Sequence, residues 1–199
     1  MLTIFHIPRT RSQRVVWLAE EMGIPYELKA EQFGQPSPEF LAANPSGAFP
    51  AIRDGAVSMG ESTAILQYVM AAHGPTPLAL QYGDRRYADY LQFLTFGEAS
   101  MAAFLNPALM TQFMAPDDQK QNFTVEACKN LFRGRLKSLD AQLEKGDHMA
   151  GDFTAADISV VYALGIGDMM GLEADYSPQL KAYRARVQQR PAYQAAAAK

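Results

Sequence analysis

A strand, a helix and a second strand follow one another within residues 2–33. Residues 2–7 (LTIFHI) are rich in β-forming side chains, and Pro8 ends the segment. Residues 26–33 (YELKAEQF) predict a second strand. The residues between them predict a helix over 11–22, because apolar side chains recur at i, i+3, i+4 and i+7: Val15, Leu18, Ala19 and Met22. Such a βαβ unit implies two parallel strands joined by a crossover helix.

The rest of the first 80 residues continues this α/β pattern. AFPAI and AVSM predict a β-hairpin whose turn is Asp54-Gly55, and a helix is expected from Glu61 to His73. HGPTPLAL, residues 73–80, contains one glycine and two prolines, which is typical of a linker. We therefore expect a first domain over residues 1–80.

Only helices are expected after residue 84. One covers residues 87–114 with a kink at Pro107, and Pro116 is expected to open the next at its first helical position. Thr154 begins a third helix with a capping-box pattern that we assign to folding, and a fourth follows nearer the C-terminus. These segments predict an all-helical second domain over residues 85–199.

The composition indicates a globular protein of a reducing compartment. The chain has 199 residues, 48% of them hydrophobic, and a net charge of −3, which disfavours nucleic acid as a partner. Its single cysteine, Cys128, cannot form an internal disulfide. Arg9, Arg11 and Arg14 interrupt any signal-peptide core, and no apolar run reaches the ~20 residues of a membrane span. We expect a cytoplasmic location, with no membrane contact.

Four segments carry a resemblance to a known family, in that family's order and spacing: SQRVVWLAEEMGIPYEL, NPSGAFPAI, GESTAILQYV and GDFTAADISV. Over its full length the chain resembles a cytosolic glutathione S-transferase of bacterial type. The resemblance implies an α/β thioredoxin-like N-terminal domain, an all-α C-terminal helical domain and a homodimer. It also implies a detoxification enzyme that transfers the thiol of its co-substrate glutathione to a hydrophobic electrophile. No metal is expected, because the three histidines lack metal-ligand spacing.

Glu61-Ser62 stands where the expected hairpin passes into the next helix. A helix N-terminus offers unpaired N–H groups and a partial positive charge. The Ser62 hydroxyl and N–H suit the α-carboxylate of the γ-glutamyl group, and the Glu61 carboxylate suits the neighbouring ammonium. On its own the pair is more typical of a helix cap with a dipole partner. The family resemblance makes glutathione binding the preferred interpretation.

Phe49-Pro50 precedes a short strand, and the resemblance implies that this peptide bond is cis. That geometry would turn the Phe49 backbone outward, where it pairs with the cysteinyl backbone of glutathione as with an added strand. The alternative is a trans proline, the usual state of an X–Pro bond. The family often has lysine at the position of Ala48, in contact with the glycyl carboxylate. Here that charge is missing, and Gln35 is the nearest substitute by position.

Thr10, Arg11 and Ser12 occupy the loop in which the family ionises the thiol of glutathione. An unperturbed thiol of pKa ~8.5 is about 3% ionised at pH 7, whereas a pKa lower by two units gives about 75% thiolate. The family uses Tyr, Ser or Cys after its first strand. Phe5 or His6 occupies the tyrosine position, and neither Arg11 nor Ser12 is cysteine, which excludes those two mechanisms here. Counting back from Arg14-Val15, Thr10 matches the serine of theta-like members.

Thr10 also has a compatible interpretation as a helix cap. Residues 10–13 (TRSQ) fit the capping box, in which Thr10 accepts a bond from the N–H three residues on and Gln13 reaches back. A capping hydroxyl accepts with its oxygen and can still donate its proton to a sulfur. We expect Thr10 to be the catalytic thiolate donor, with Ser12 and Arg11 as alternatives.

Site residues in the helical part are implied by the resemblance alone. In several family members a carboxylate reaches across the dimer to the ammonium of glutathione, a role that falls here to Glu98. A solvated charge on a helix is the alternative. Phe104, Met110 and Phe113 are candidates for the second-substrate pocket, although such residues at helical spacing are often part of a core.

Three functions are compatible with these residues. The first is conjugation of glutathione to an electrophile. The second is a glutathione-dependent disulfide or peroxide reductase on the same scaffold, and the third is a non-catalytic binding protein. The intact Glu61-Ser62 pair disfavours the third, because a pure scaffold has no need of a site for a zwitterion.

Overall fold

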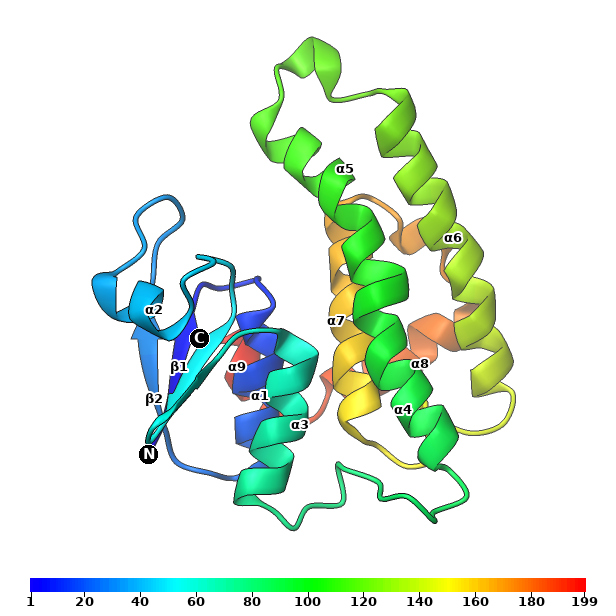
Figure 1. Ribbon diagram of the computed structural model, residues 1–199. Coiled ribbons are helices and arrows are strands. Elements are labelled where there is room, and N and C mark those ends of the chain that lie inside the picture. Colours follow the sequence, from blue (N-terminus) through cyan, green and yellow to red (C-terminus); the bar gives the residue numbers. More distant parts are fainter. The chain divides into compact units, whose positions relative to one another are not determined.

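β1 (Leu2–His6) is an inner strand of the only sheet in the protein. The computed structural model describes residues 1–199, which divide into two compact units, the first made of residues 1–79 and 188–199. The sheet has the order β2-β1-β3-β4, with β2 at Tyr26–Ala30, β3 at Ala51–Asp54 and β4 at Val57–Met59 (Figure 1). β1 pairs parallel with β2 and antiparallel with β3, and β3 and β4 form an antiparallel hairpin. The predicted βαβ unit and hairpin are both confirmed.

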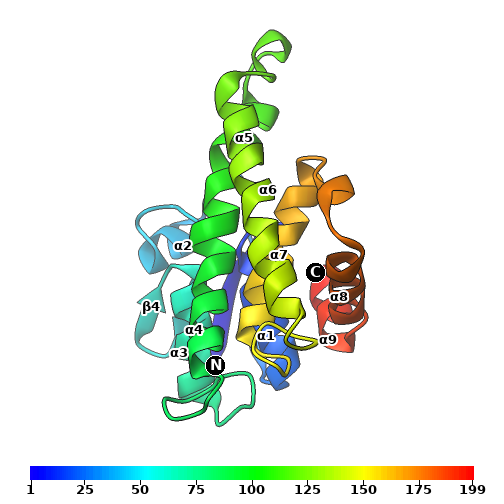
Figure 2. The same cartoon turned by 90° about the vertical axis from the view of Figure 1, so that its right-hand side faces the viewer.

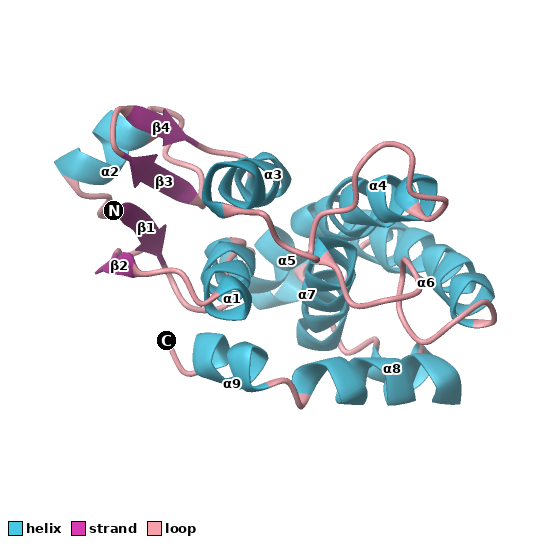
Figure 3. Cartoon of the chain, turned by 90° about the horizontal axis from the view of Figure 1, so that it is seen from below, coloured by secondary structure: helices cyan, strands magenta, loops and turns pink.

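Helices cover both faces of this sheet (Figure 3). α1 (Ser12–Met22) and α3 (Ser62–His73) lie on one face, and α2 (Pro38–Ala43) lies on the other. Phe5 packs toward α2, with its ring centroid 5.7 Å from that of Phe40. Because side chains alternate along a strand, His6 projects to the opposite face, toward α1. This alternation places the His6 side chain beside the loop between β1 and α1, which carries candidate site residues.

The second unit, residues 80–187, is helical throughout, as predicted. α5 and α6 run side by side (Figure 2). Most of the residues of α7 are buried. Its elements in chain order are α4 (Tyr87–Phe96), the π-helix η1 (Gly97–Ala102), α5 (Ala103–Met114), the 3-10 turn η2 (Asp117–Gln119), α6 (Phe123–Leu143), α7 (Ala155–Met169), the 3-10 turn η3 (Glu173–Asp175) and α8 (Pro178–Gln188). With the sheet domain, this confirms the expected fold class of an α/β domain followed by helices.

The helix expected over residues 87–114 is interrupted by η1. Gly97, the first residue of η1, lies so close to α7 that a β-carbon there would be 2.5 Å from the backbone carbonyl of Ser159. The Ser159 hydroxyl in turn donates to the carbonyl of Leu94, at 2.8 Å. Glycine is therefore required at this crossing. Pro107 lies inside α5.

The helix that we expected to open at Pro116 begins at Phe123 instead. Pro116 has an extended backbone, with ψ 152°, and only the short turn η2 follows it. The side chain of Asn122 accepts a hydrogen bond of 3.0 Å from the N–H of Val125, so Asn122 is the N-cap of α6. The amide oxygen of Asn122 accepts a bond from an N–H that has no partner within the helix, and a proline side chain has no oxygen that could do so.

Two side chains form the predicted capping box at the start of α7. Asp157 accepts a bond of 2.8 Å from the Thr154 N–H, and the Thr154 hydroxyl accepts from the N–H of Ala156. The buried Tyr183 hydroxyl also donates to Asp157, at 2.9 Å. The motif therefore joins α7 to α8, in keeping with a role in folding.

The C-terminal helix α9 (Pro191–Ala197) packs against α1 in the first unit. Arg190 donates to both carboxylate oxygens of Glu21, each at 2.7 Å. Residues 188–199, which we grouped with the helical domain, thus belong to the same compact unit as the sheet. None of the helices combines the length and apolar character that a membrane crossing requires.

Candidate functional site

The loop from β1 to α1 holds the three candidates for stabilising a thiolate. The half-buried Thr10 donates its hydroxyl to the carbonyl of Ile7 at 2.8 Å and lies 2.8 Å from Ser12 Oγ. Ser12 is 0% exposed, whereas Arg11 is partly exposed and directly precedes α1. Of the two hydroxyl-bearing residues, Thr10 is therefore the less buried.

The capping box that we expected at Thr10 is wrong. α1 begins at Ser12 with Arg11 at its N-cap position, so Thr10 lies one position before the cap, and its hydroxyl accepts a long bond of 3.4 Å from the N–H of Ser12. The Gln13 N–H donates to the backbone carbonyl of Thr10, at 2.9 Å, instead of to its hydroxyl. The Gln13 side chain donates to the carbonyl of Ala196 in α9 rather than reaching back to Thr10.

The start of α3 combines a serine hydroxyl with a buried arginine. Ser62 is 2% exposed, and its Oγ accepts a hydrogen bond of 2.9 Å from Nη1 of Arg14, in α1. Because Oγ is the acceptor in this bond, the Ser62 proton can be donated to a carboxylate. The guanidinium charge of Arg14 adds to the partial positive charge at the N-terminus of α3. This end of α3 is therefore a favourable place for an anion.

Two non-glycine residues have positive φ, and both adjoin the candidate site residues. Arg9, with φ 65°, precedes Thr10, and Glu61, with φ 66°, precedes Ser62. Such backbone costs on the order of 1–3 kcal/mol and is found mainly at functional sites. Glu61 occupies the N-cap position of α3 but makes no capping hydrogen bond with its exposed side chain. Ser62 is thus not the cap of this helix, and the Glu61 carboxylate faces solvent.

The loop before β3 is held by its own hydrogen bonds and by an aromatic stack. The Phe49–Pro50 bond is cis, as the resemblance implied, and the Phe49 ring stacks on Phe40 with 4.2 Å between centroids. Asn44 Nδ2 donates to the carbonyl of Ala48 at 2.6 Å. A β-carbon at Gly60 would lie 2.9 Å from the same Nδ2, so this loop touches the residue just before Glu61.

The two positions considered for the glycyl carboxylate are both exposed. Gln35 lies in a surface turn closed by its own N–H, which donates to the carbonyl of Gln32 at 3.3 Å. Ala48 brings no charge. The cations Lys29 and Arg53 both pair with Glu39, and the hydrogen bond from Lys29 is the main reason that the pKa of Glu39 is lowered.

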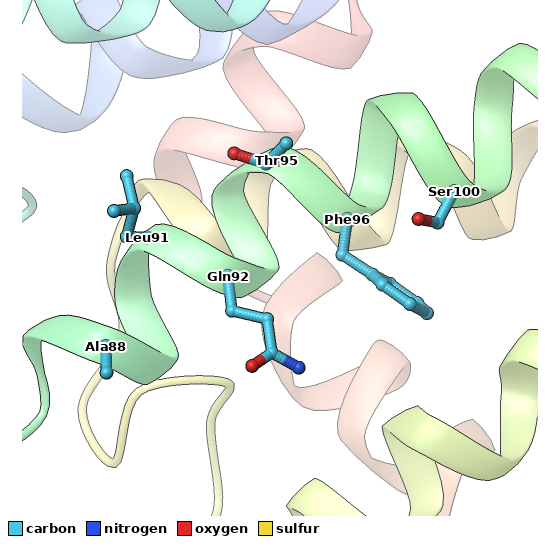
Figure 4. A pocket seen from close by; sticks show the side chains of 6 residues that line it. All are labelled: Ala88, Leu91, Gln92, Thr95, Phe96 and Ser100. Carbon is cyan, nitrogen blue, oxygen red and sulfur yellow. The ribbon is translucent and has the colours of Figure 1, made fainter.

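The remaining predicted residues belong to the second unit. Glu98 is half-buried in η1, and Phe104 lies beneath the guanidinium of Arg135, 5.1 Å from its ring centroid. Met110 and Phe113 are 55% and 67% exposed. A separate, open groove of about 480 Å³ runs along α4 and η1, and none of these four residues lines it. Figure 4 shows its lining side chains: Ala88, Leu91, Gln92, Thr95, Phe96 and Ser100.

Arg14 and His6 were not among the predicted site residues, although each is hydrogen-bonded to one of them. Arg14 is fully buried although it is charged, and His6 is 1% exposed with Nδ1 at 2.7 Å from Ser12 Oγ. One signal for Arg14 was a cation directly before the apolar helix face that begins at Val15. His6 carried no comparable signal, because its partner is set by the path of the loop. No group of three or more His, Cys, Asp or Glu side chains is arranged to hold a metal ion.

Comparison with protein families assigns both parts of the chain. Residues 5–77 match the glutathione S-transferase N-terminal domain, and residues 100–191 match the glutathione S-transferase C-terminal domain. Together the two matches cover most of the chain.

Individual relatives agree with these matches. Glutathione S-transferase 1 of Zea mays is 32% identical, over 90% of this chain and 87% of its own. Glutathione S-transferase 3 of Schizosaccharomyces pombe is 26% identical, over 100% of this chain and 88% of its own. A sphingomonad glutathione S-transferase solved in complex with glutathione superposes with a TM-score of 0.82 at 28% identity, covering 98% of this chain and 97% of that one.

Proposed function

The chain belongs to the glutathione S-transferase family, and on that premise we propose that it adds the thiolate of glutathione to an electrophilic small molecule. It is a glutathione transferase. The observation that carries the proposal is the Glu61-Ser62 pair at the start of α3, where a buried Arg14 bonds the Ser62 hydroxyl at 2.9 Å. A carboxylate, a donor hydroxyl and a helix N-terminus together match the zwitterionic end of glutathione.

In the proposed binding mode, the γ-glutamyl carboxylate accepts bonds from the Ser62 hydroxyl and N–H. The Glu61 carboxylate pairs with the ammonium beside it. The cysteinyl backbone pairs with the N–H and carbonyl of Phe49, ahead of Pro50, as an added strand would. Gln35 is the candidate for the glycyl carboxylate.

For the thiol, Thr10 is the proposed hydroxyl donor, as in theta-like members of the family. Its support is that Thr10 is only half-buried, whereas Ser12 is fully buried. A hydrogen bond to the charged form of a thiol lowers its pKa and so raises the thiolate fraction at neutral pH. Arg11, partly exposed at the same helix start, is the remaining alternative.

The proposed reaction starts when the thiol of bound glutathione loses its proton to solvent. The thiolate sulfur then donates an electron pair to an electrophilic carbon and forms a C–S bond. In a displacement the leaving group departs with the electrons of the broken bond. In epoxide opening the released oxygen takes up a proton. The protein binds the tripeptide and stabilises the thiolate, and it forms no covalent bond.

We also propose a homodimer that acts in cytoplasmic detoxification. The exposed apolar groove along α4 and η1, with Leu91 at 41% exposure, supports a two-fold contact. Glu98, in η1, is then the candidate that meets the ammonium of glutathione across the dimer. Phe104, Met110 and Phe113 are the candidates for binding the hydrophobic electrophile.

Retention on immobilised glutathione, followed by a substrate panel, tests this function. The panel contains a chlorinated aromatic compound, an epoxide, a hydroperoxide and a mixed disulfide. We expect retention, and turnover of a carbon electrophile. Turnover of the disulfide or hydroperoxide alone would assign the reductase function instead. Retention without any turnover would indicate a binding protein, and failure to bind glutathione would reject the proposed site.

A further inference from the structure

His6 is a buried imidazole whose two nitrogens have different surroundings. It lies at the end of β1 with 1% exposure, and its Nδ1 is 2.7 Å from Ser12 Oγ. Its Nε2 is buried and has no hydrogen-bond partner. Burial lowers the pKa of His6, so the ring is neutral and carries one proton.

The unpartnered Nε2 decides which nitrogen holds that proton. A buried N–H without an acceptor is the rarer and costlier arrangement, whereas an unused lone pair is better tolerated. The proton therefore belongs on Nδ1, and His6 donates to Ser12 Oγ. The Ser12 hydroxyl must then donate its own proton to an acceptor other than His6.

Ser12 has two acceptors for its proton. Thr10 Oγ1 lies at 2.8 Å, and the carbonyl of Ile7 lies farther away, at 3.2 Å. When Ser12 donates to Thr10, the Thr10 proton can go only to another acceptor. Without ligand that acceptor is the Ile7 carbonyl, at 2.8 Å. The same carbonyl also accepts from the Thr10 N–H at 3.2 Å, so it stays bonded if the hydroxyl turns away.

We propose that His6 is a positioning residue for catalysis, which donates to Ser12 so that Ser12 donates to Thr10 and the Thr10 proton is directed at the sulfur of bound glutathione. This inference rests on the proposed role of Thr10 and adds two buried residues to it. Hydrogen bonds in such a chain polarise one another, so the chain strengthens Thr10 as a donor. No proton is transferred to His6, because its buried ring resists a positive charge.

The test measures the thiol pKa of bound glutathione by ultraviolet absorbance of the thiolate in wild-type protein and in His6→Phe. Phenylalanine keeps the ring shape and removes both nitrogens. We expect the thiol pKa to rise by roughly half a unit to one unit. His6→Asn, which retains a donor near the position of Nδ1, should recover most of the shift. Binding of S-methylglutathione, which has no ionisable thiol, should change little in either variant.

Ser12→Ala removes the middle residue of the hydrogen-bonded series His6, Ser12 and Thr10, and it should raise the thiol pKa of bound glutathione as His6→Phe does. It therefore provides a second test if His6→Phe does not fold. His73→Phe is the matched control, because His73 bonds Asp54 on the hairpin and should leave the thiol pKa unchanged. A rise in Thr10→Val with none in His6→Phe or Ser12→Ala would overturn this inference and leave the proposed function intact. No rise in any of the three would overturn the role of Thr10 as well.

Discussion

The guanidinium of Arg14 donates to the Ser62 hydroxyl at 2.9 Å, and this bond joins two helices whose residues are 48 positions apart. Both side chains are buried. The bond fixes the Ser62 oxygen as an acceptor, so its proton points to a second partner. It also places a cation beside the N-terminus of α3. The proposed carboxylate site is therefore built from α1 as much as from α3.

Arg14→Met should weaken glutathione binding by about ten- to 150-fold, because a hydrogen bond involving a charged group contributes about 1.5–3 kcal/mol. Ser62→Ala should weaken it by roughly 1–3 kcal/mol for the same reason. Titration calorimetry measures both variants and the double variant. Since the two residues form one contact, the double variant should lose less than the sum of the single losses. Fully additive losses would show that Arg14 acts independently of Ser62.

Glu61→Gln should reduce the affinity for glutathione by about three- to tenfold, because the ammonium loses a charged partner at a solvent-facing position. Glutamine is nearly isosteric, so the positive φ of Glu61 and the melting temperature should be unaffected. A glutathione analogue without the amino group provides the control and should bind both proteins equally. A similar loss of affinity for this analogue would show that Glu61 does not bind the ammonium.

Local patterns predicted the elements that local interactions specify. β1, β3 and the Asp54-Gly55 turn follow from β-forming residues and from a glycine with φ 59°. The capping box at Thr154 was also readable, because both partners lie within four residues. The same pattern failed at Thr10, where the loop delays the helix start until Ser12. A capping motif thus predicts a helix start only when the preceding loop allows it.

Contacts between residues that are far apart in the sequence could not be predicted from local patterns. The π-helical segment η1 depends on how closely Gly97 meets Ser159, a residue of another helix. The Arg14–Ser62 bond depends on the packing of α1 against α3. Burial separates Thr10 from Ser12 as candidates, and no spacing in the TRSQ segment encodes burial. The contacts of Arg14 and Ser12 thus depend on tertiary packing that the spacing of residues does not encode.

Gly97→Ala should destabilise the protein by about 1–3 kcal/mol, because its β-carbon would meet backbone atoms that cannot move aside cheaply. Gly134→Ala is a matched control in the exposed part of α6, where a β-carbon would meet nothing within 4 Å. It should stabilise the protein by roughly 0.5–1 kcal/mol. Urea denaturation measures both variants, and opposite signs are expected. Equal effects would contradict the close crossing of η1 and α7.

Leu91→Glu should convert the proposed dimer into a monomer, because it places a charge in the apolar groove along α4. Leu131→Glu, on α6, is the control, since Leu131 is 39% exposed and lies outside the lining of this groove. Analytical ultracentrifugation at micromolar concentration should show a dimer for the wild type and for Leu131→Glu. A monomeric wild type would contradict both the proposed dimer and the proposed role of Glu98 across its interface.

Thr10→Val should lower turnover at pH 7 far more than at pH 9. Loss of the donor raises the thiol pKa, so the rate profile moves to higher pH. If Thr10 lowers that pKa by two units, its loss reduces the thiolate fraction at pH 7 by about 25-fold but at pH 9 by only about 1.3-fold. Thr10→Ser keeps the hydroxyl and should retain or raise activity. The valine variant also loses the bonds of the Thr10 hydroxyl with the Ser12 N–H and the Ile7 carbonyl, so we expect a stability loss of about 1 kcal/mol as well. A loss of turnover that is equal at both pH values would show that Thr10 acts on something other than ionisation of the thiol, and Arg11→Ala would then be the next variant to measure.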